Sequence, residues 1–273
     1  MELSYLTPQR EAAILDTIRE AGKIMLTALD IENHVDAKPG TRNFVTAFDV
    51  KVQAFLEEKL HKIVPEAAFL GEEEEKHVFP MDRPCFVIDP IDGTTNFIHD
   101  FRVSCISVGI ADRDESVWGA VWNPYTGDMF TGKKGAGAYL NGKPIHCTAH
   151  PLSDSLVSVG TSPYIRDVAG HETFVLAEKI FMASADVRRS GSAAWDLCLV
   201  ACGRQDGFYE MILGPWDYCA SDVILREAWA VLTRMDGRKI SYKESCSALA
   251  GNPVCHPELL HITKNVHTPD QNM

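Results

Sequence analysis

The chain has 273 residues, which is enough for one large domain or two packed lobes. Its 26 basic and 38 acidic residues give a formal net charge of −12, and without a basic stripe a nucleic-acid partner is not expected. The N-terminus lacks a signal peptide's basic region and apolar core, and no apolar run reaches membrane-spanning length. We therefore expect a cytoplasmic protein with no membrane partner.

The eight cysteines show neither a Cys-x-x-Cys pair nor a zinc spacing, and several lie in apolar runs. We interpret them as reduced, buried thiols in a reducing compartment. His146-Cys147 with His150 could be read as a metal cluster, but it follows the loop signal Asn141-Gly142. Coincidence is the better interpretation of this trio.

The first elements that the sequence predicts are two helices. Thr7-Pro8 predicts a helix N-terminus, and apolar residues at helical spacing continue to about Asp30. Residues 33–43 are expected to form a loop. The pattern Thr46-Ala47-Phe48-Asp49 is typical of a capping box before a second helix that ends near Val64.

A brief strand over residues 67–70 is predicted next, and it runs into an acidic segment. Consecutive glutamates usually form a solvated loop, which we expect for Glu74 and Glu75. Glu72 directly follows the strand and a glycine, so its carboxylate can be held in a fixed position.

The most informative segment is 86–97, where an apolar run ends in two aspartates. Cys85–Ile88 predicts a short buried strand that Pro90 terminates. Asp89 and Asp92 then leave the sheet at the same end, where two carboxylates repel each other unless a cation lies between them. A strand-end turn would explain this motif alone, but the acids that accompany it favour a hard divalent cation such as Mg2+.

The remainder of the first half predicts an antiparallel meander. Strands over 103–110 and 117–122 are followed by a turn at 123–127, and Asn141-Gly142 is a type I′ hairpin signal. Residues 149–155 separate this mainly β half from an α/β half. We therefore divide the chain into an N-terminal α+β lobe, 1–150, and a C-terminal α/β lobe, 151–273, which together form one structural unit.

The second half predicts alternating strands and helices. The strands are expected over 156–159, 187–189 and 206–211, with short strand-like pieces at 240–242 and 249–251. The helices are expected over 171–182, 193–202, 218–232 and 257–265.

Four acids follow strands or stand at a helix start, and they are Glu72, Asp89, Asp92 and Asp217. Asp217 by itself would be explained as the cap of the helix expected from Tyr218. Together the four could hold two metal ions roughly 3.5–4 Å apart, one activating water and the other stabilising the leaving oxygen. Backbone N–H groups of Gly93-Thr94-Thr95 and of Gly191-Ser192-Ala193, each before an expected helix, would suit a phosphate.

Three segments in this order resemble the inositol monophosphatase family: Gly71-Glu72-Glu73, Asp89–Phe97, and Trp216-Asp217 followed by Glu227-Ala228. The likeness runs from the first helix to about Gly251. It implies a layered αβαβα sandwich of mixed α+β and α/β character. It also implies a lithium-sensitive phosphomonoesterase that uses two or three Mg2+ ions and forms a homodimer.

The resemblance also assigns roles to residues. The implied metal ligands are Glu72, Asp89, the backbone carbonyl of Ile91, Asp92 and Asp217. The implied catalytic residues are Glu72 and Thr94, with Asp49 orienting Thr94 as it helps to activate the attacking water. The implied substrate-binding residues are Gly93, Thr94, Gly191, Ser192, Ala193, Glu210 and Asp217. Glu210 matches a position that binds a polyol hydroxyl, and Lys38 matches a loop lysine near the metals.

Two departures from the family pattern stand out. Trp229-Ala230 replace a common Gly-Gly, for which we expect altered packing and retained activity. The third and fourth glutamates of 72–75 are unusual, and solvated charge is the expected outcome.

The leading hypothesis for function is hydrolysis of inositol monophosphate. Alternatives with the same chemistry are fructose 1,6-bisphosphate, adenosine 3′,5′-bisphosphate and histidinol phosphate, and Glu210 favours a small phosphorylated polyol over a nucleotide. A different class is a regulatory binding protein, because the resemblance includes a bacterial relative that acts in transcription.

Overall fold

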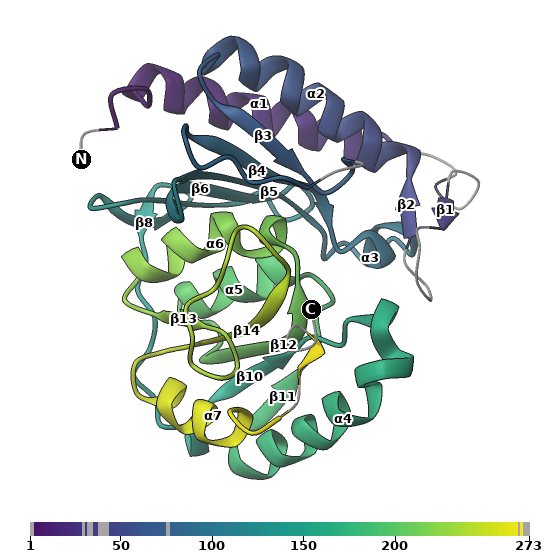
Figure 1. Ribbon diagram of the computed structural model, residues 1–273, viewed down its shortest axis with the longest axis vertical. Helices are drawn as coiled ribbons and strands as arrows, with labels where there is room; N and C mark the ends of the chain where they lie inside the picture. Colours follow the sequence, from purple (N-terminus) through teal and green to yellow (C-terminus); the bar gives the residue numbers. More distant parts are fainter. Residues whose placement is uncertain are drawn as a thin grey trace.

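The computed structural model describes residues 3–28, 31, 35–37, 44–74, 77–266 and 268–269. Its elements stack in layers: α1 with α2, a seven-stranded sheet, α5 with α6, a five-stranded sheet, and α4 with α7 (Figure 1). This is the expected αβαβα sandwich. The described helices are α1 (Pro8–Leu26), α2 (Ala47–Ile63), α3 (Thr94–Ile98), α4 (Arg166–Ala183), α5 (Ala193–Ala201), α6 (Pro215–Glu227) and α7 (Cys255–Thr263).

The seven-stranded sheet is the predicted meander with one parallel strand added at its edge. Its strands, in spatial order, are β3 (Ala68–Gly71), β4 (Cys85–Asp92), β5 (Cys105–Asp112), β6 (Glu115–Asn123), β7 (Asp128–Lys133), β8 (Gly137–Leu140) and β9 (Lys143–Pro144). Only β3 pairs in parallel, with β4. Asn141 and Gly142 take φ values of 50° and 76° between β8 and β9, which confirms the hairpin turn.

The five-stranded sheet mixes parallel and antiparallel pairs. Its strands, in spatial order, are β11 (Asp186–Arg188), β10 (Leu156–Val159), β12 (Gly207–Leu213), β14 (Cys246–Gly251) and β13 (Val231–Thr233). Strand β10 pairs in parallel with β11 and β12, and β14 is antiparallel to β12 and β13. A separate antiparallel pair joins β1 (Val35–Ala37) to β2 (Phe44–Thr46).

Helix α6 packs closely against the seven-stranded sheet because β5, β6 and β7 each present a glycine to it. A Cβ on Gly109 of β5 would come within 2.6 Å of Cys219 Sγ, and one on Gly119 of β6 within 2.3 Å of the Ala220 carbonyl oxygen. The missing side chains let the helix backbone rest on the sheet. This contact fixes the start of α6, which carries Asp217, near the end of β4.

Six predictions about elements or their boundaries were wrong. Helix α1 ends at Leu26, where Thr27 caps it, and Asp30 lies outside the described residues. Residues 35–37, expected in a loop, form β1 because β2 pairs with them. Strand β4 continues through Pro90 to Asp92, because a register shift between Asp89 and Asp92 interrupts the ladder where the proline lacks its N–H.

Three further corrections concern the second half, beginning with α6, which was expected over 218–232. It begins at Pro215 and ends at Glu227, because Trp229 takes a left-handed φ of 68° and redirects the chain into β13. Residues 240–242 are not a strand, and α4 begins at Arg166, ahead of the expected start.

All eight cysteines are free, and six of them are buried, as expected for reduced thiols that pack as small apolar side chains. Within the described residues, no helix has both the length and the apolar character that crossing a bilayer requires.

Candidate active site

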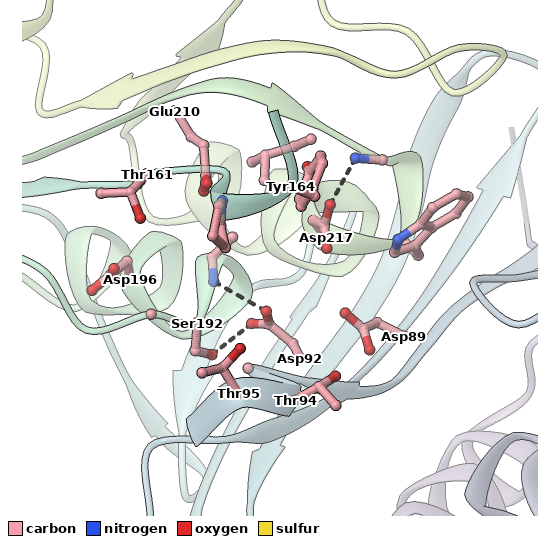
Figure 2. Close-up of a pocket in the computed structure, with 18 of the residues that line it drawn as sticks. Asp89, Asp92, Thr94, Thr95, Thr161, Tyr164, Ser192, Asp196, Glu210 and Asp217 are labelled. Atoms are coloured by element: carbon pink, nitrogen blue, oxygen red, sulfur yellow. Dashed lines mark hydrogen bonds between the residues drawn. The ribbon is translucent and has the colours of Figure 1, made fainter. Parts of the chain in front are cut away.

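Three aspartates from two elements converge where β4 ends and α6 begins. Asp89 and Asp92 lie on β4 and Asp217 on the first turn of α6. One carboxylate oxygen from each lies within 4.8 Å of the others, and the side chains point toward one shared space (Figure 2). The structure thus brings together three of the acids that the sequence singled out.

The three carboxylates repel one another in a buried setting. Burial is the largest cause that raises the pKa of Asp89 and of Asp217 well above the usual value, and the charges of Glu72 and Asp92 raise both further. All three groups offer only oxygen ligands, and a cation between them would neutralise their repulsion. Such a set suits a hard divalent ion such as Mg2+. The residues present therefore fit the metal that the family resemblance implies.

Asp92 differs from its two neighbours because donors surround it. Its carboxylate accepts hydrogen bonds from Ser192 Oγ at 2.6 Å, from the Ala194 amide at 2.8 Å and from the Ala193 amide at 3.1 Å. These donors partly offset the burial that raises its pKa. The start of α5 is thereby fixed beside β4, which brings Ser192 and Ala193 into the site.

Asp217 was expected to cap a helix beginning at Tyr218, but it is the third residue of α6. Its Oδ2 accepts the Gly214 amide at 2.7 Å, so it closes the first turn from inside the helix. The capping and ligand roles are compatible, because a carboxylate has two oxygens.

Thr94 and Asp49 are in direct contact, as the resemblance implies. Thr94 Oγ1 lies 3.1 Å from Asp49 Oδ1 and 3.1 Å from the Ile91 carbonyl oxygen. The capping box of α2 is confirmed as well, because Asp49 Oδ2 accepts the Thr46 amide at 2.8 Å. Burial raises the pKa of Asp49 to about 6 in spite of these hydrogen bonds.

Glu72 lies just after β3, where its amide donates to the Ile88 carbonyl at 3.1 Å. It is half-buried and lines the same cavity as the three aspartates, although it is not part of their 4.8 Å cluster. Ile91 also lines this cavity. Lys38, the loop lysine of the resemblance, lies outside the described residues.

Glu210 on β12 faces the cavity from the side opposite Asp89 (Figure 2). Its Oε1 accepts the Ser162 amide at 2.8 Å and Ser162 Oγ at 2.9 Å. Burial nevertheless raises the pKa of Glu210 to about 7. Glu210 is therefore a fixed hydrogen-bond acceptor at the edge of the site.

The cavity has a volume of about 260 Å³. This is near the lower end of the range for small-molecule sites. All of the predicted substrate residues line it: Gly93, Thr94, Gly191, Ser192, Ala193, Glu210 and Asp217.

Sequence reasoning missed several residues that line the cavity, namely Thr161, Tyr164, Arg189, Asp196 and Trp216, together with Ser162, which holds Glu210. A sequence signal existed for Trp216, which belongs to the Trp216-Asp217 motif, and for the loop that holds Ser162. Gly160-Thr161-Ser162-Pro163 directly follows the predicted strand at 156–159, and a Cβ on Gly160 would come within 2.2 Å of the Glu210 carboxylate.

The trio His146, Cys147 and His150 makes no metal centre in the described part of the chain, where the three aspartates form the one group identified. The His150 ring instead lies 3.0 Å from Asp206, and His146 stacks on Trp229.

Comparison with known proteins gives a consistent answer. A model described as the inositol monophosphatase family matches residues 8–268. The inositol monophosphatase of Dictyostelium discoideum is 34% identical over 258 residues, which cover 93% of this chain and 94% of that protein. Nus factor SuhB of Salmonella typhimurium strain LT2 is 33% identical over 238 residues, covering 86% and 88%.

Solved structures agree with these relatives. The extragenic suppressor protein suhB from Bartonella henselae matches with a TM-score of 0.85 and 29% identity, covering 93% of this chain and 98% of that one. Fold, site geometry and sequence similarity lead to one conclusion: the chain belongs to the inositol monophosphatase family.

Proposed function

We propose that this protein hydrolyses inositol monophosphate to inositol and inorganic phosphate, with Mg2+ as its cofactor. Membership of the family supports the broader class, a metal-dependent phosphoric monoester hydrolase. The observation that carries the proposal is the convergence of Asp89, Asp92 and Asp217 on a small cavity that Glu210 closes on the opposite side.

Asp89, Asp92 and Asp217 would hold the cation, with Glu72 and the carbonyl of Ile91 as further ligands, and we propose two or three ions. Bound Mg2+ supplies positive charge that admits an anionic ester, lowers the pKa of water and stabilises the leaving oxygen. The acids of this chain repel a phosphate dianion when no cation is present, so metal and substrate binding are linked.

Residues of the chain orient the attacking water, accept its proton and bind the phosphate. Thr94 Oγ1 orients the attacking water, and its contact with Asp49 gives the released proton a route to a carboxylate whose pKa of about 6 suits transfer near neutral pH. The water oxygen forms a bond to phosphorus, the P–O bond to inositol breaks, and the departing alkoxide takes a proton from solvent. Backbone N–H groups of Gly93 and Thr94 are assigned to the phosphate.

Glu210 is assigned to the inositol ring. A carboxylate held by two donors from Ser162 can accept from a ring hydroxyl with its free oxygen, and this fixes the orientation of the leaving group. Ser192 and Ala193 form the adjoining wall.

The test is phosphate release, with and without Mg2+, from myo-inositol 1-phosphate, fructose 1,6-bisphosphate, adenosine 3′,5′-bisphosphate and histidinol phosphate in parallel. We expect Mg2+-dependent turnover of the inositol ester, inhibition by LiCl, and loss of turnover in Asp89→Asn. Asp186→Asn, an exposed acid away from the cavity, is the matched control. No release from any ester would overturn the proposal.

A regulatory binding role is the second candidate, because relatives that are 33% identical carry the name Nus factor SuhB. Pulldowns with the wild type and Asp89→Asn separate the two functions. A partner retained equally by both proteins would support a binding role independent of catalysis.

We also propose a homodimer located in the cytoplasm. Helix α4 exposes Val168, Phe174, Phe181 and Met182, whose exposed fractions lie between 51% and 77%, and such an apolar face suits a second copy of the chain. Free cysteines favour a reducing compartment. Light scattering should give about twice the 30.2 kDa chain mass, and Phe174→Glu should reduce it to the monomer.

A further inference from the structure

His77 lies outside the catalytic cavity and joins two segments that line it. Its Nε2 lies 3.2 Å from the carbonyl oxygen of Glu72, and its ring packs against Trp216 with centroids 4.5 Å apart and planes at 46°. Because a carbonyl oxygen can only accept, the ring nitrogen is the donor. Glu72 and Trp216 both line the cavity, whereas His77 does not. His77 thus connects two walls of the site from the outside.

Trp216 is a fixed partner for this histidine. It directly precedes Asp217 in the first turn of α6, and its carbonyl oxygen accepts a hydrogen bond from Ser107 Oγ on β5 at 3.1 Å. Its ring fills the space beside Gly214, where a Cβ would come within 2.4 Å of the indole. Contacts with the sheet and with its own helix start therefore hold Trp216 independently of His77.

Glu72 depends more on His77, because the two polar groups of its backbone have one partner each on opposite sides. Its amide donates to the Ile88 carbonyl of β4 at 3.1 Å, and its carbonyl accepts from His77. The side chain is half-buried and lies outside the 4.8 Å cluster of the three aspartates. The direction in which its carboxylate leaves the backbone therefore decides whether it can reach a cation that the aspartates bind.

The segment that carries His77 is itself anchored in the core. Phe79, two residues further on, is 8% exposed, and its ring lies 6.0 Å from that of Tyr242. Val78 between them is 74% exposed. A side chain on a segment fixed in this way can restrain Glu72, and its exposed neighbour provides a control position on the same segment.

We infer that His77 is a positioning residue for the metal site, which holds Glu72 where its carboxylate reaches a cation bound by the three aspartates. His77 itself touches neither the metal nor the substrate. The inference rests on the metal ligands of the proposed function and extends them to a residue outside the cavity. Groups that orient a ligand through hydrogen bonds set metal affinity along with the ligand itself. A histidine that only covered the surface of Trp216 would leave this affinity unchanged.

The experiment is a calorimetric titration of the metal-free protein with Mg2+. We expect His77→Ala, which loses both contacts, to bind Mg2+ about tenfold more weakly than the wild type. His77→Gln keeps a donor for the Glu72 carbonyl and His77→Phe keeps a ring for Trp216, so each should lose less affinity than His77→Ala. Val78→Ala is the control and should bind as the wild type does. Thermal unfolding in EDTA should be the same for all of these proteins. Equal Mg2+ affinity of His77→Ala and the wild type would overturn the inference.

A double-mutant cycle with Glu72→Gln tests whether His77 acts through Glu72. If it does, adding His77→Ala to Glu72→Gln should cause no further loss of Mg2+ affinity. The same loss in both backgrounds would refute this role.

The kinetic counterpart is the Mg2+ dependence of phosphate release. In His77→Ala the Mg2+ concentration for half-maximal rate should rise by about tenfold, while kcat at saturating Mg2+ changes by no more than about twofold. The titrations need no catalysis, so they separate the two proposals. If the wild type released no phosphate from any ester, the proposed function would fail, while weaker Mg2+ binding by His77→Ala would still support the positioning role. A wild type that bound no Mg2+ would overturn it.

Discussion

Thr94 Oγ1 contacts Asp49 Oδ1 at 3.1 Å, although the two residues lie 45 positions apart, one at the start of α3 and the other in the first turn of α2. The same carboxylate completes the capping box with Thr46 through its other oxygen. One buried aspartate thus fixes a helix end and orients a hydroxyl of the candidate active site.

The Thr94→Val variant removes this hydroxyl and keeps the shape of the side chain. We expect kcat to fall by about 10²- to 10⁴-fold, because the proton of the attacking water loses its route to Asp49. Thr94→Ser is the matched control and should retain most activity. Calorimetric Mg2+ titration should give the same affinity for all three proteins, and a large loss of Mg2+ binding in Thr94→Val would point to a ligand role instead.

Asp89→Asn should make the metal-free protein more stable and the enzyme inactive. Asp89 is buried among like charges that raise its pKa, and its carboxylate accepts a hydrogen bond from the Ile91 amide, so neutralisation removes repulsion at the loss of little hydrogen bonding. Thermal unfolding in EDTA and then in Mg2+ checks this. We expect a higher Tm than the wild type in EDTA and a smaller rise on adding Mg2+. A lower Tm in EDTA would contradict the repulsion argument.

Asp196 on α5 should make stability fall with rising pH between about 4 and 6. It is buried and accepts hydrogen bonds from Ser158, Ser190 and Gln205, yet burial raises its pKa to about 6 from an unfolded value of 3.8. Between these values the folded state binds more protons than the unfolded state, so the free energy of unfolding decreases as pH rises and levels off above about 6.

The variant Asp196→Asn isolates this effect. One pKa unit corresponds to about 1.4 kcal/mol. The difference in the free energy of unfolding, variant minus wild type, should therefore be roughly 2–3 kcal/mol larger at pH 7 than at pH 4. Urea titrations of the metal-free proteins at several pH values measure the difference. Parallel curves for the two proteins would show that Asp196 titrates normally.

Trp229 is the departure from the family's common Gly-Gly, and it takes a left-handed φ of 68°. Its ring stacks on His146 with centroids 3.9 Å apart and planes 8° from parallel. The strained backbone costs about 1–2 kcal/mol, and the stacked pair returns about 0.5–1.5 kcal/mol. We therefore expect Trp229→Gly to be nearly neutral and Trp229→Ala to lower the free energy of unfolding by about 1–2 kcal/mol.

Thermal denaturation of the two Trp229 variants checks this ranking, because both lose the stacked ring and differ only in backbone freedom. Activity should stay unchanged in both, since Trp229 follows the end of α6 opposite to Asp217. Equal stability of the glycine and alanine variants would contradict the strain argument.

The sequence by itself determined the features that depend on a few neighbouring residues. The Thr7-Pro8 helix start, the capping box at Thr46–Asp49 and the Asn141-Gly142 turn each form through contacts within about one turn of chain, so local patterns predict them. The buried strand over Cys85–Ile88 was predicted for the same reason, whereas its continuation through Pro90 to Asp92 was not. Asp217 became a candidate through its place at a helix start, and the family resemblance then implied that it binds metal.

Only the tertiary structure decided what depends on contacts between distant segments. Helix α6 ends early because the chain after it forms β13, which pairs with β14. Strand β1 forms because it pairs with β2. Arg189 and Ser162 reach the cavity because β10, β11 and β12 are neighbours in one sheet. Bringing such distant segments together costs chain entropy, which packing across the whole core offsets. A short window of the sequence therefore does not predict these contacts.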